Sequence, residues 1–534
     1  MFDKNFEFKE EAGDLVFGLV APVGIDLDIV ISKMTTYLTQ YQFDVHVVHL
    51  STIANTFFNN KLDNNSQHLR ISIGMERCSK LRQEYERNDF FALSAISEIS
   101  KNRKGKSKNK IAYIVRSIKH PDEIITLKKV YGQSFYLTGI TASKETRRKH
   151  LQSGLGIDNL SIVDELIEKD HAEENKYGQN TRDVFQNADV FIDLDNQSWD
   201  DSIGRFTDLV FGNPLITPTP FEHSMFLAYM ASVRSGDLSR QVGAVITSKE
   251  FDILSLGAND VPKYGGGQYW PKSDDWDDDR DIVRKIDPNE ERRNEIVLNV
   301  MAALESEALD ESKEDKLERG KRLLKDTGLL DLTEYGRVVH AEMEALLCAA
   351  RNGVGISKSL LFTTTFPCHN CAKHIVAAGV DTVKFIEPYP KSYATKLHSD
   401  SISVESKDNG LKKVKFEPFV GVGPRRYLDL FSMSLGSGEK SKRKLKGCTI
   451  QWSRSGKSPR TYKSQVAIEL AESKYAEYYR TYIVSKKKDH SKDPLCEKCG
   501  SIMVKRVASR GKQRGRQFWG CSTYPKCNST VSIN

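Results

Sequence analysis

The chain has 534 residues, of which 39% are hydrophobic and 28% charged; this is typical of water-soluble globular proteins and long enough for two large domains and a small module. No stretch approaches the roughly 20 apolar residues that span a membrane, and the acidic N-terminal segment lacks the apolar core of a secretory signal. We therefore expect a cytoplasmic protein without membrane contact. The formal net charge is +7, but residues 486–534 contain twelve Lys/Arg and three Asp/Glu, a net charge of +9, which leaves −2 elsewhere. A nucleic-acid interaction is therefore expected of this tail alone.

The first 215 residues alternate short apolar runs with helical or polar stretches. The apolar run at 15–24 is followed by helical spacing of apolar residues over 27–38. Further apolar runs lie at 43–51, 111–120, 133–141 and 188–194. This alternation predicts an α/β domain with a parallel sheet covered on both faces. The proline-rich stretch 211–220 predicts a boundary, so the first domain is predicted to span 1–215.

The segment GLVAPVG, residues 18–24, lies between a predicted strand and a predicted helix. Backbone N–H groups at a helix start suit a phosphate, so Gly18, Gly24 and Asp26 are candidate nucleotide-binding residues of a P-loop-like turn. The segment departs from the P-loop pattern, because five residues instead of four separate the glycines, Ile25 replaces the lysine and Asp26 replaces Ser/Thr. A strand–turn–helix without a binding role explains these residues nearly as well.

The second domain, predicted over 216–485, contains a two-part metal motif. HAE at 340–342 lies on a predicted helix, and PCHNC at 367–371 lies on a turn between a predicted strand and helix. A catalytic zinc ion takes three protein ligands and keeps a fourth position open. His340, Cys368 and Cys371 fill three positions, and Glu342 is close enough to move protons without being a ligand. This H-x-E…P-C-x-x-C pattern matches the known signature of zinc-dependent base deaminases.

A structural zinc site is the competing interpretation of this motif. It requires a fourth protein ligand, which would have to be His369, His374 or Glu342. Both halves of the deaminase pattern occur in order on a helix, strand, turn and helix, so catalysis is the favoured interpretation. The charged stretch 273–325 predicts solvent-exposed helices inserted before the motif.

Four segments of this domain resemble deoxycytidylate deaminases: residues 222–261, 334–346 (EYGRVVHAEMEAL), 364–380 (TTFPCHNCAKHIVAAGV) and 387–400 (EPYPKSYATKLHSD). The resemblance implies the cytidine deaminase fold, a mixed five-stranded sheet between helices, and deoxycytidine nucleotides as substrates. It also implies that Asn259 reaches the sugar or base and that Arg234 or Arg240 handles phosphate, with Tyr389 lining the pocket. Surface arginines and a core tyrosine are the alternatives.

A wider resemblance covers about residues 1–480. Its segments look like bacterial anti-phage deaminases that fuse a P-loop, nucleotide-kinase-like domain to a deoxycytidylate deaminase domain; they are 116–151, 178–194, 205–222 and 419–433. The resemblance implies conversion of dCTP and dCMP to the uracil forms, which depletes dCTP during infection. It further implies a regulatory nucleotide at the N-terminal domain and homo-oligomers restrained in some systems by a small RNA. Because the P-loop lysine is missing, nucleotide sensing without hydrolysis is an open alternative.

The tail, 486–534, contains four clustered cysteines. Cys496 and Cys499 form C-x2-C, and Cys521 and Cys527 form C-x5-C. Four thiolates complete a structural zinc site, which a module this small needs for its stability. The stretch FWGCSTYPKC resembles the four-cysteine zinc ribbon of bacterial type I topoisomerases. The basic run 506–516, together with the aromatic residues Phe518, Trp519 and Tyr524, suits single-stranded nucleic acid; a solvated basic face that serves stability or assembly is the alternative.

The leading hypothesis is a deaminase of free deoxycytidine nucleotides with one catalytic and one structural zinc ion and regulatory appended domains. The alternative is a polynucleotide cytosine deaminase, acting on single-stranded DNA or RNA and guided by the basic tail, because the same zinc chemistry serves both substrates. A non-catalytic nucleic-acid-binding scaffold is disfavoured, since every catalytic residue is present.

Overall fold

The computed structural model divides the chain into two compact units, Met1–Pro218 with Val420–Asn534, and Thr219–Phe419. We call them the N-terminal unit and the central unit. The structure describes residues 13–58, 67–104, 110–171, 178–272, 277–304, 311–325, 327–332, 334–389, 392–404, 412–434, 441–486, 494–508, 516–521, 524 and 527–533.

The N-terminal unit is built on a six-stranded sheet with the order β12-β5-β4-β1-β3-β2. The first five strands in the chain run parallel, and β12 pairs antiparallel with β5. The strands are β1 (Leu15–Val20), β2 (Asp44–His49), β3 (Ile111–Arg116), β4 (Phe135–Thr141), β5 (Val190–Asp193) and β12 (Gly421–Val422). Because β1, β3 and β4 are buried along almost their whole length, both faces of the sheet are covered, as predicted.

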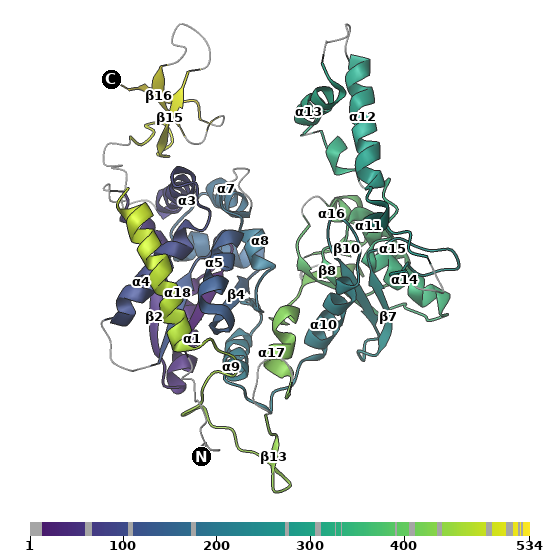
Figure 1. The fold of residues 1–534 in the computed structure, drawn as a ribbon, viewed down its shortest axis with the longest axis horizontal. Helices are drawn as coiled ribbons and strands as arrows, with labels where there is room; N and C mark the ends of the chain where they lie inside the picture. The colour runs from purple at the N-terminus through teal and green to yellow at the C-terminus, as the bar shows by residue number, and fades with distance from the viewer. Residues whose placement is uncertain are drawn as a thin grey trace, which may run out of the picture. The chain divides into compact units, whose positions relative to one another are not determined.

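Two groups of helices cover this sheet (Figure 1). α1 (Leu27–Gln40) packs against α9 (Trp199–Val210), and both share a core with β1. A second group packs together, namely α4 (Phe90–Lys104), α5 (Pro121–Tyr131) and α18 (Gln465–Tyr478). The other helical segments are α2 (Leu50–Asn55), α3 (Gln67–Glu84), η1 (Gly132–Ser134), α6 (Lys144–Lys149), η2 (His150–Gly154), α7 (Leu160–His171), α8 (Thr181–Phe185), η4 (Pro424–Arg426), α17 (Tyr427–Phe431) and η5 (Tyr479–Val484).

Residues 420–485 contact the N-terminal unit, although the sequence predicted them to belong to the deaminase domain. β12 extends the first sheet, and the buried Arg426 donates to the Phe135 carbonyl at 2.6 Å. α18 packs on α4, where Glu472 pairs with Arg103. The chain therefore returns to its first unit after completing the second. The packing of 420–485 is long-range, so their position along the sequence does not reveal it.

The central unit has a mixed six-stranded sheet with the order β10-β11-β9-β8-β6-β7. Its strands are β6 (Gly243–Thr247), β7 (Ile253–Ala258), β8 (Leu360–Thr365), β9 (Thr382–Glu387), β10 (Ile402–Ser403) and β11 (Val414–Pro418). β7 and β6 form an antiparallel hairpin, β6 pairs antiparallel with β8, and the β8, β9, β11 and β10 pairings are parallel. The mixed sheet expected from the resemblance is present, with the two-residue β10 as a sixth strand.

Three helices pack around this sheet, α10 (Pro220–Val233), α14 (Ala341–Arg351) and α15 (His369–Ala377). α14 lies directly on β7 at Gly257, where an added Cβ would come within 2.2 Å of the Ala341 carbonyl oxygen. Only glycine allows this approach. Because Ala341 opens α14, Gly257 fixes the position of the helix start and of the residues around it.

A charged insertion separates β7 from α14. It contains α11 (Asp281–Arg284), α12 (Pro288–Leu304), α13 (Lys313–Leu323) and the short η3 (Leu329–Asp331). α12 and α13 pack against each other and extend away from the sheet of the central unit (Figure 1). The prediction of exposed helices in this stretch agrees with the described part of the insertion.

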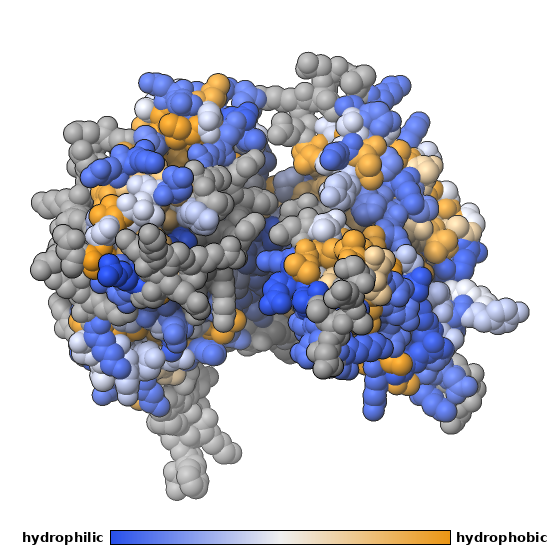
Figure 2. Space-filling model, turned by 90° about the horizontal axis from the view of Figure 1, so that it is seen from above, coloured by the Kyte–Doolittle hydropathy of each residue, from blue (hydrophilic) through white to orange (hydrophobic). Residues whose placement is uncertain are grey.

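Two small sheets complete the described chain. One is a hairpin of β13 (Lys444–Leu445) and β14 (Cys448–Thr449). In the central unit, the short helix α16 (Ala394–Leu397) follows β9. The C-terminal module is an antiparallel sheet of β15 (Met503–Val507), β16 (Gln517–Cys521) and β17 (Thr530–Ser532). Figure 2 shows a largely hydrophilic surface with scattered hydrophobic groups. None of the helices in the described ranges combines the length and apolar character needed to cross a bilayer.

Candidate active site

The predicted metal ligands of the central unit come from two helix starts. His340 is the N-cap residue of α14, Cys368 is the N-cap residue of α15, and Cys371 lies in the first turn of α15. The His340 Nδ1 atom lies 3.3 Å from the Cys368 sulfur and 3.4 Å from the Cys371 sulfur. Zinc–ligand distances of about 2.1 and 2.3 Å in tetrahedral geometry imply an N···S separation of about 3.6 Å. The three residues therefore fit a zinc ion and leave one tetrahedral position open.

Electrostatics within this triad favour the thiolate of Cys368. The hydrogen bond from Cys371, followed by the contact with His340, lowers the pKa of Cys368 to about 4. The same contact with Cys368 raises the pKa of His340 to about 9. The hydrogen bond with Cys368, together with burial, raises the pKa of Cys371 well above its usual value. Metal ligands must be deprotonated, so metal binding at this triad displaces protons and weakens at low pH.

Glu342 lies beside the triad and is almost fully buried, with 4% of its surface exposed. Its Oε2 atom is 3.5 Å from the Cys371 sulfur, and its Oε1 atom accepts from the Thr363 hydroxyl at 3.4 Å. Burial raises the pKa of its carboxyl. A carboxyl with a raised pKa next to an open metal position is suited to accept and return a proton near neutral pH.

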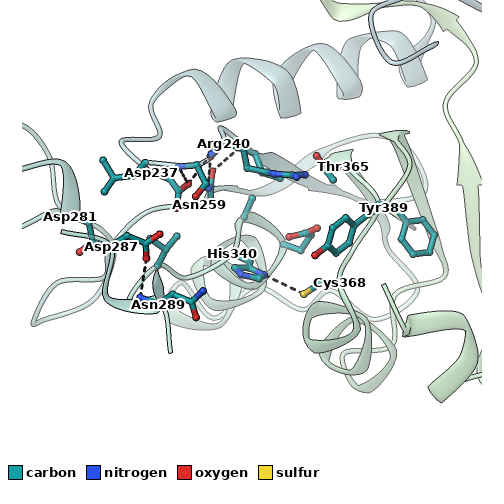
Figure 3. Close-up of a pocket in the computed structure, with 18 residues that line it drawn as sticks. Asp237, Arg240, Asn259, Asp281, Asp287, Asn289, His340, Thr365, Cys368 and Tyr389 are labelled. Atoms are coloured by element: carbon teal, nitrogen blue, oxygen red, sulfur yellow. Dashed lines mark hydrogen bonds between the residues drawn. The ribbon is translucent and has the colours of Figure 1, made fainter. Parts of the chain in front are cut away.

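The triad opens into a cavity of about 300 Å³, large enough for a nucleoside-sized group (Figure 3). His340, Glu342 and Cys368 line its metal end. The rest of the cavity is lined by mostly polar side chains, which include Asp237, Arg240, Asn259, Asp281, Asp287, Asn289, Thr365, Phe366 and Tyr389.

Three of the four predicted substrate contacts line this cavity. Asn259 accepts from the Val242 amide at 2.7 Å and donates to the Arg240 carbonyl at 2.8 Å. It therefore fixes the backbone of 240–242, which forms part of the cavity wall. The Arg240 guanidinium lies 5.7 Å from the Tyr389 ring centre and 3.3 Å from a Glu387 carboxylate oxygen. These contacts set Arg240 and Tyr389 together at one side of the cavity (Figure 3).

Arg234 is placed elsewhere. It donates to the Tyr269 carbonyl at 2.8 Å, bonds the Gln268 side chain, and lies 4.0 Å from the Trp270 ring centre. Burial lowers the pKa of its guanidinium. These partners hold the loop after β7, so Arg234 acts on the fold of the pocket rather than on its lining.

Several acidic and amide residues that line the cavity were not predicted from the sequence. Asp287 and Asn289 come from the charged insertion, which was interpreted only as solvated helices. Asp287 accepts from the backbone amides of Asn289 and Glu290, as a residue before a helix commonly does. The Asp-Pro-Asn sequence at 287–289 signals a helix start, but nothing in it signals a position beside the metal triad.

The glycine-rich turn of the N-terminal unit shows a different arrangement. Gly24 has a φ of +91° and packs so closely on Arg147 that an added Cβ would lie 2.8 Å from it. Asp26 caps α1 by accepting from the Asp28 amide at 3.0 Å, and Gly18 lies within β1. The Val23 amide donates at 2.7 Å to the buried Asp170 carboxylate. An internal carboxylate thus occupies an amide that a phosphate would use.

The four cysteines of the C-terminal module also converge. Their sulfurs lie within 4.8 Å of one another, with 3.7 Å between Cys496 and Cys527 and 3.4 Å between Cys499 and Cys521. Zinc–sulfur bonds of about 2.3 Å in a tetrahedron imply S···S distances of about 3.8 Å, so the cluster fits a structural zinc ion. In the basic run 506–516, residues 509–515 lie outside the described ranges. Of its aromatic neighbours, Trp519 lies 5.2 Å from the Lys505 amine and Tyr524 lies 5.3 Å from the Arg506 guanidinium.

Comparison with known proteins agrees with both metal clusters. Residues 221–387 match the family described as the cytidine and deoxycytidylate deaminase zinc-binding region, and residues 493–534 match the topoisomerase DNA binding C4 zinc finger. The chain is 25% identical over 222 residues to a probable deoxycytidylate deaminase of Drosophila melanogaster, covering 40% of this chain and 86% of that protein. It is 35% identical over 83 residues to ComE operon protein 2 of Bacillus subtilis, covering 15% and 44%.

A human enzyme and a solved structure of a phage enzyme are also similar to this chain. The human deoxycytidylate deaminase is 26% identical over 165 residues, which cover 31% of this chain and 63% of that protein. A dCMP deaminase from the cyanophage S-TIM5, solved with dCMP and dUMP, is 20% identical with a TM-score of 0.22, and the match covers 38% of this chain and 98% of that chain. The deaminase match and the metal triad inside it identify the chain as a zinc-dependent deaminase.

Proposed function

We propose that this enzyme hydrolytically deaminates free deoxycytidine nucleotides, converting dCMP, dCTP or both to the uracil nucleotide and ammonia. The observation that carries this proposal is the cavity in which His340, Cys368 and the buried Glu342 share one wall. The substrate class is supported by the similarity to proteins named deoxycytidylate deaminases.

His340, Cys368 and Cys371 would hold the catalytic zinc ion, which when bound supplies activation of water at neutral pH. Glu342 accepts one proton from the attacking water and delivers it to the ring nitrogen, while the water oxygen bonds to the ring carbon that carries the amino group. Glu342 then takes the remaining proton of that oxygen and passes it to the amino group as the C–N bond breaks, so that a carbonyl forms and ammonia leaves. Thr363 holds one carboxylate oxygen of Glu342, so the other oxygen is kept toward the cysteines and the reacting atoms.

Substrate orientation is assigned to the opposite side of the cavity. Asn259 lines the cavity and holds the backbone of 240–242, and we assign it to the sugar or base. Arg240 is the exposed cation among the cavity-lining residues, so we assign it to the phosphate. Tyr389 lies beside Arg240 and supplies an aromatic surface for the nucleoside. Arg234 has a supporting role, because its partners lie in the loop after β7.

The test is direct. Purified, zinc-loaded protein is incubated with dCMP, dCTP, CMP and a cytosine-containing oligonucleotide, and uracil products are quantified by chromatography. We expect product from a free deoxynucleotide. Product from the oligonucleotide alone would overturn the proposal and support a polynucleotide deaminase. That second candidate is favoured by one observation, the C-terminal match to a DNA-binding zinc finger. We propose that this module binds single-stranded nucleic acid, including a regulatory RNA, and does not select the substrate.

We further propose that the N-terminal unit is a nucleotide-kinase-like regulatory domain with a P-loop-like turn and that the enzyme works as a homo-oligomer in defence against phage. The resemblance of residues 1–480 to anti-phage deaminases supports this role, and the parallel sheet is an architecture that binds nucleotides at its carboxyl edge. Infection of cells that express either the wild type or Glu342→Ala tests the role. Protection and dCTP depletion are expected only with the wild type, and equal protection by both proteins would refute it.

A further inference from the structure

The N-terminal unit contains a second cavity, of about 810 Å³, at the carboxyl ends of β2 and β3. α2, α3 and the start of α4 complete its walls. Ligand pockets of proteins usually measure about 300 to 1,000 Å³, so the cavity can hold a molecule the size of a nucleotide. In open parallel sheets, ligands bind outside the carboxyl ends of the strands where the strand order reverses. In the order β2-β3-β1-β4, the chain leaves β1 in one direction along the sheet and leaves β3 in the other, so the reversal lies between β3 and β1.

The lining of this cavity is strongly cationic. Among the described residues that line it, the charged side chains are one acidic residue, Asp28, and five basic residues, which are Arg70, Arg77, Arg82, Arg116 and Lys119. Asp28 pairs with Arg116, and Lys119 pairs with Asp170 at 2.7 Å. The other cations of the lining are the three arginines from α3, of which Arg82 also pairs with Glu123.

Arg82 gives the sharpest indication of an absent partner. Only 2% of its surface is exposed, and its Nη2 atom pairs with Glu123 at 2.7 Å. Its Nε and Nη1 atoms are buried, and no atom of the described residues accepts a hydrogen bond from them. The Phe91 ring, 5.0 Å away, holds the guanidinium plane in place. Buried donors are nearly always satisfied in folded proteins, so two unsatisfied donors on a side chain that lines a cavity indicate an anionic ligand.

Arg77 adds a second buried guanidinium to the same wall. It is 3% exposed, donates to the Asn55 side chain at 3.0 Å, and lies 4.8 Å from the Phe58 ring centre. Burial lowers the pKa of the Arg77 guanidinium. Planar guanidinium groups bind phosphate oxygens in pairs of hydrogen bonds, which makes arginine suited to phosphate recognition.

The apolar part of the lining suits an organic group attached to the phosphate. Phe58, Met75 and Phe91 contribute to the walls beside the arginines. The glycine-rich turn does not compete for the phosphate, because Asp170 already accepts from the Val23 amide and from Lys119. We infer that the cavity between α3 and the ends of β2 and β3 binds a nucleoside phosphate, with Arg82 and Arg77 holding the phosphate. A regulatory effect of this ligand rests on the regulatory role proposed above, whereas its binding does not.

Binding is tested on the full, zinc-loaded chain by isothermal titration calorimetry. The probes are nucleotides without cytosine, ATP, GTP, dTMP and UMP, together with inorganic pyrophosphate. We expect at least one nucleotide to bind, and Arg82→Gln to weaken it by about 10-fold or more, the loss of one charge-assisted contact. Because Arg82 also pairs with Glu123, a second variant is needed, and the exposed Arg70→Gln is expected to weaken binding without affecting folding. Circular dichroism verifies the fold of each variant.

Two controls separate this site from the deaminase cavity and from general charge effects. Lys33→Gln removes a cation from the exposed face of α1 and is expected to leave the affinity unchanged. Arg240→Gln alters the deaminase cavity and is also expected to leave the affinity for the nucleotide unchanged. No binding of any nucleotide, or binding that neither Arg82→Gln nor Arg70→Gln weakens, would overturn the inference. Pyrophosphate binding as tightly as the best nucleotide would overturn the nucleoside part. A failure of deamination would leave these titrations unaffected.

Discussion

The metal triad and the glycine-rich turn are two strand–turn–helix junctions with different outcomes. At the start of α15, the turn brings its own ligands, because Cys368 and Cys371 lie on one turn and meet His340 at 3.3 and 3.4 Å. At the start of α1, the turn offers backbone amides, and Asp170 from the distant α7 accepts one of them at 2.7 Å. A motif made of side chains is therefore readable from its residues, whereas one made of backbone donors depends on what the rest of the fold brings to it.

The largest effect is expected from removing one ligand of each zinc site. Two metal clusters predict two zinc ions per chain. Cys368→Ser should lose one ion and all deaminase activity, because two protein ligands do not hold a catalytic zinc. Cys499→Ser should also lose one ion but retain deamination. Metal analysis by mass spectrometry and a product assay check this prediction, and equal activity of the two variants would contradict it.

Glu342→Ala should retain both zinc ions and lower kcat by about 10³-fold, within the range that general acid–base groups contribute. Glu344 offers a matched control on the same helix, since it is buried to a similar degree but bonds Arg351 at 2.6 Å instead of facing the cavity. Glu344→Gln should retain most of the activity. If Glu342→Ala turned over at the wild-type rate, the assignment of Glu342 as the proton carrier would be wrong.

Asp170→Ala tests whether the glycine-rich turn needs its internal carboxylate. The substitution leaves Lys119 and the Val23 amide without this partner, so the free energy of unfolding should fall by about 3 kcal/mol. Asp164, on the same helix, is partly exposed and pairs with Arg148. Asp164→Ala should cost much less, because solvent screens an exposed pair. Urea unfolding measures the free energy of unfolding of both variants. An equal loss in the two variants would show that the glycine-rich turn does not depend on the Asp170 carboxylate.

Glu472 resembles Glu342 in burial but lies in a structural cluster with Arg103 and Asp14. Burial raises the pKa of Glu472 from 4.5 to about 7. A carboxyl with a higher pKa in the folded state binds more protons when folded, so it favours folding at low pH, and this contribution is lost as the pH rises from about 4.5 through 7.

Glu472→Gln should therefore flatten the pH dependence of stability between pH 5 and 8 by about 1 to 3 kcal/mol, the smallest of the four effects. Thermal unfolding across this pH range measures it, with the exposed Glu477→Gln on the same helix as control. A wild-type stability that increases over this range, with Glu472→Gln following the same curve, would contradict the assignment.

Local patterns predicted much of the fold and of the catalytic site. Alternating apolar runs predicted the parallel sheet of the N-terminal unit, and the spacing of the H-x-E and C-x2-C motifs predicted the residues that converge. These patterns succeed because the periodicity of apolar residues and the geometry of a turn are set by residues that are neighbours in the sequence. The course of residues 420–485 was not predicted, since β12 and α18 join a sheet and a helix layer formed hundreds of residues earlier.

The sequence by itself determined the chemistry of this protein, because the three ligands, the proton carrier and the four-cysteine cluster are side chains whose identity and spacing already specify zinc. Only the tertiary structure decided the surroundings. It brought Asp287 and Asn289 from the insertion to the active cavity, turned Arg234 away from it, and gathered the α3 arginines into a second cavity. The physical reason is that burial and pairing of charges are set by packing between distant segments, and these determine which ligand each charge can still accept.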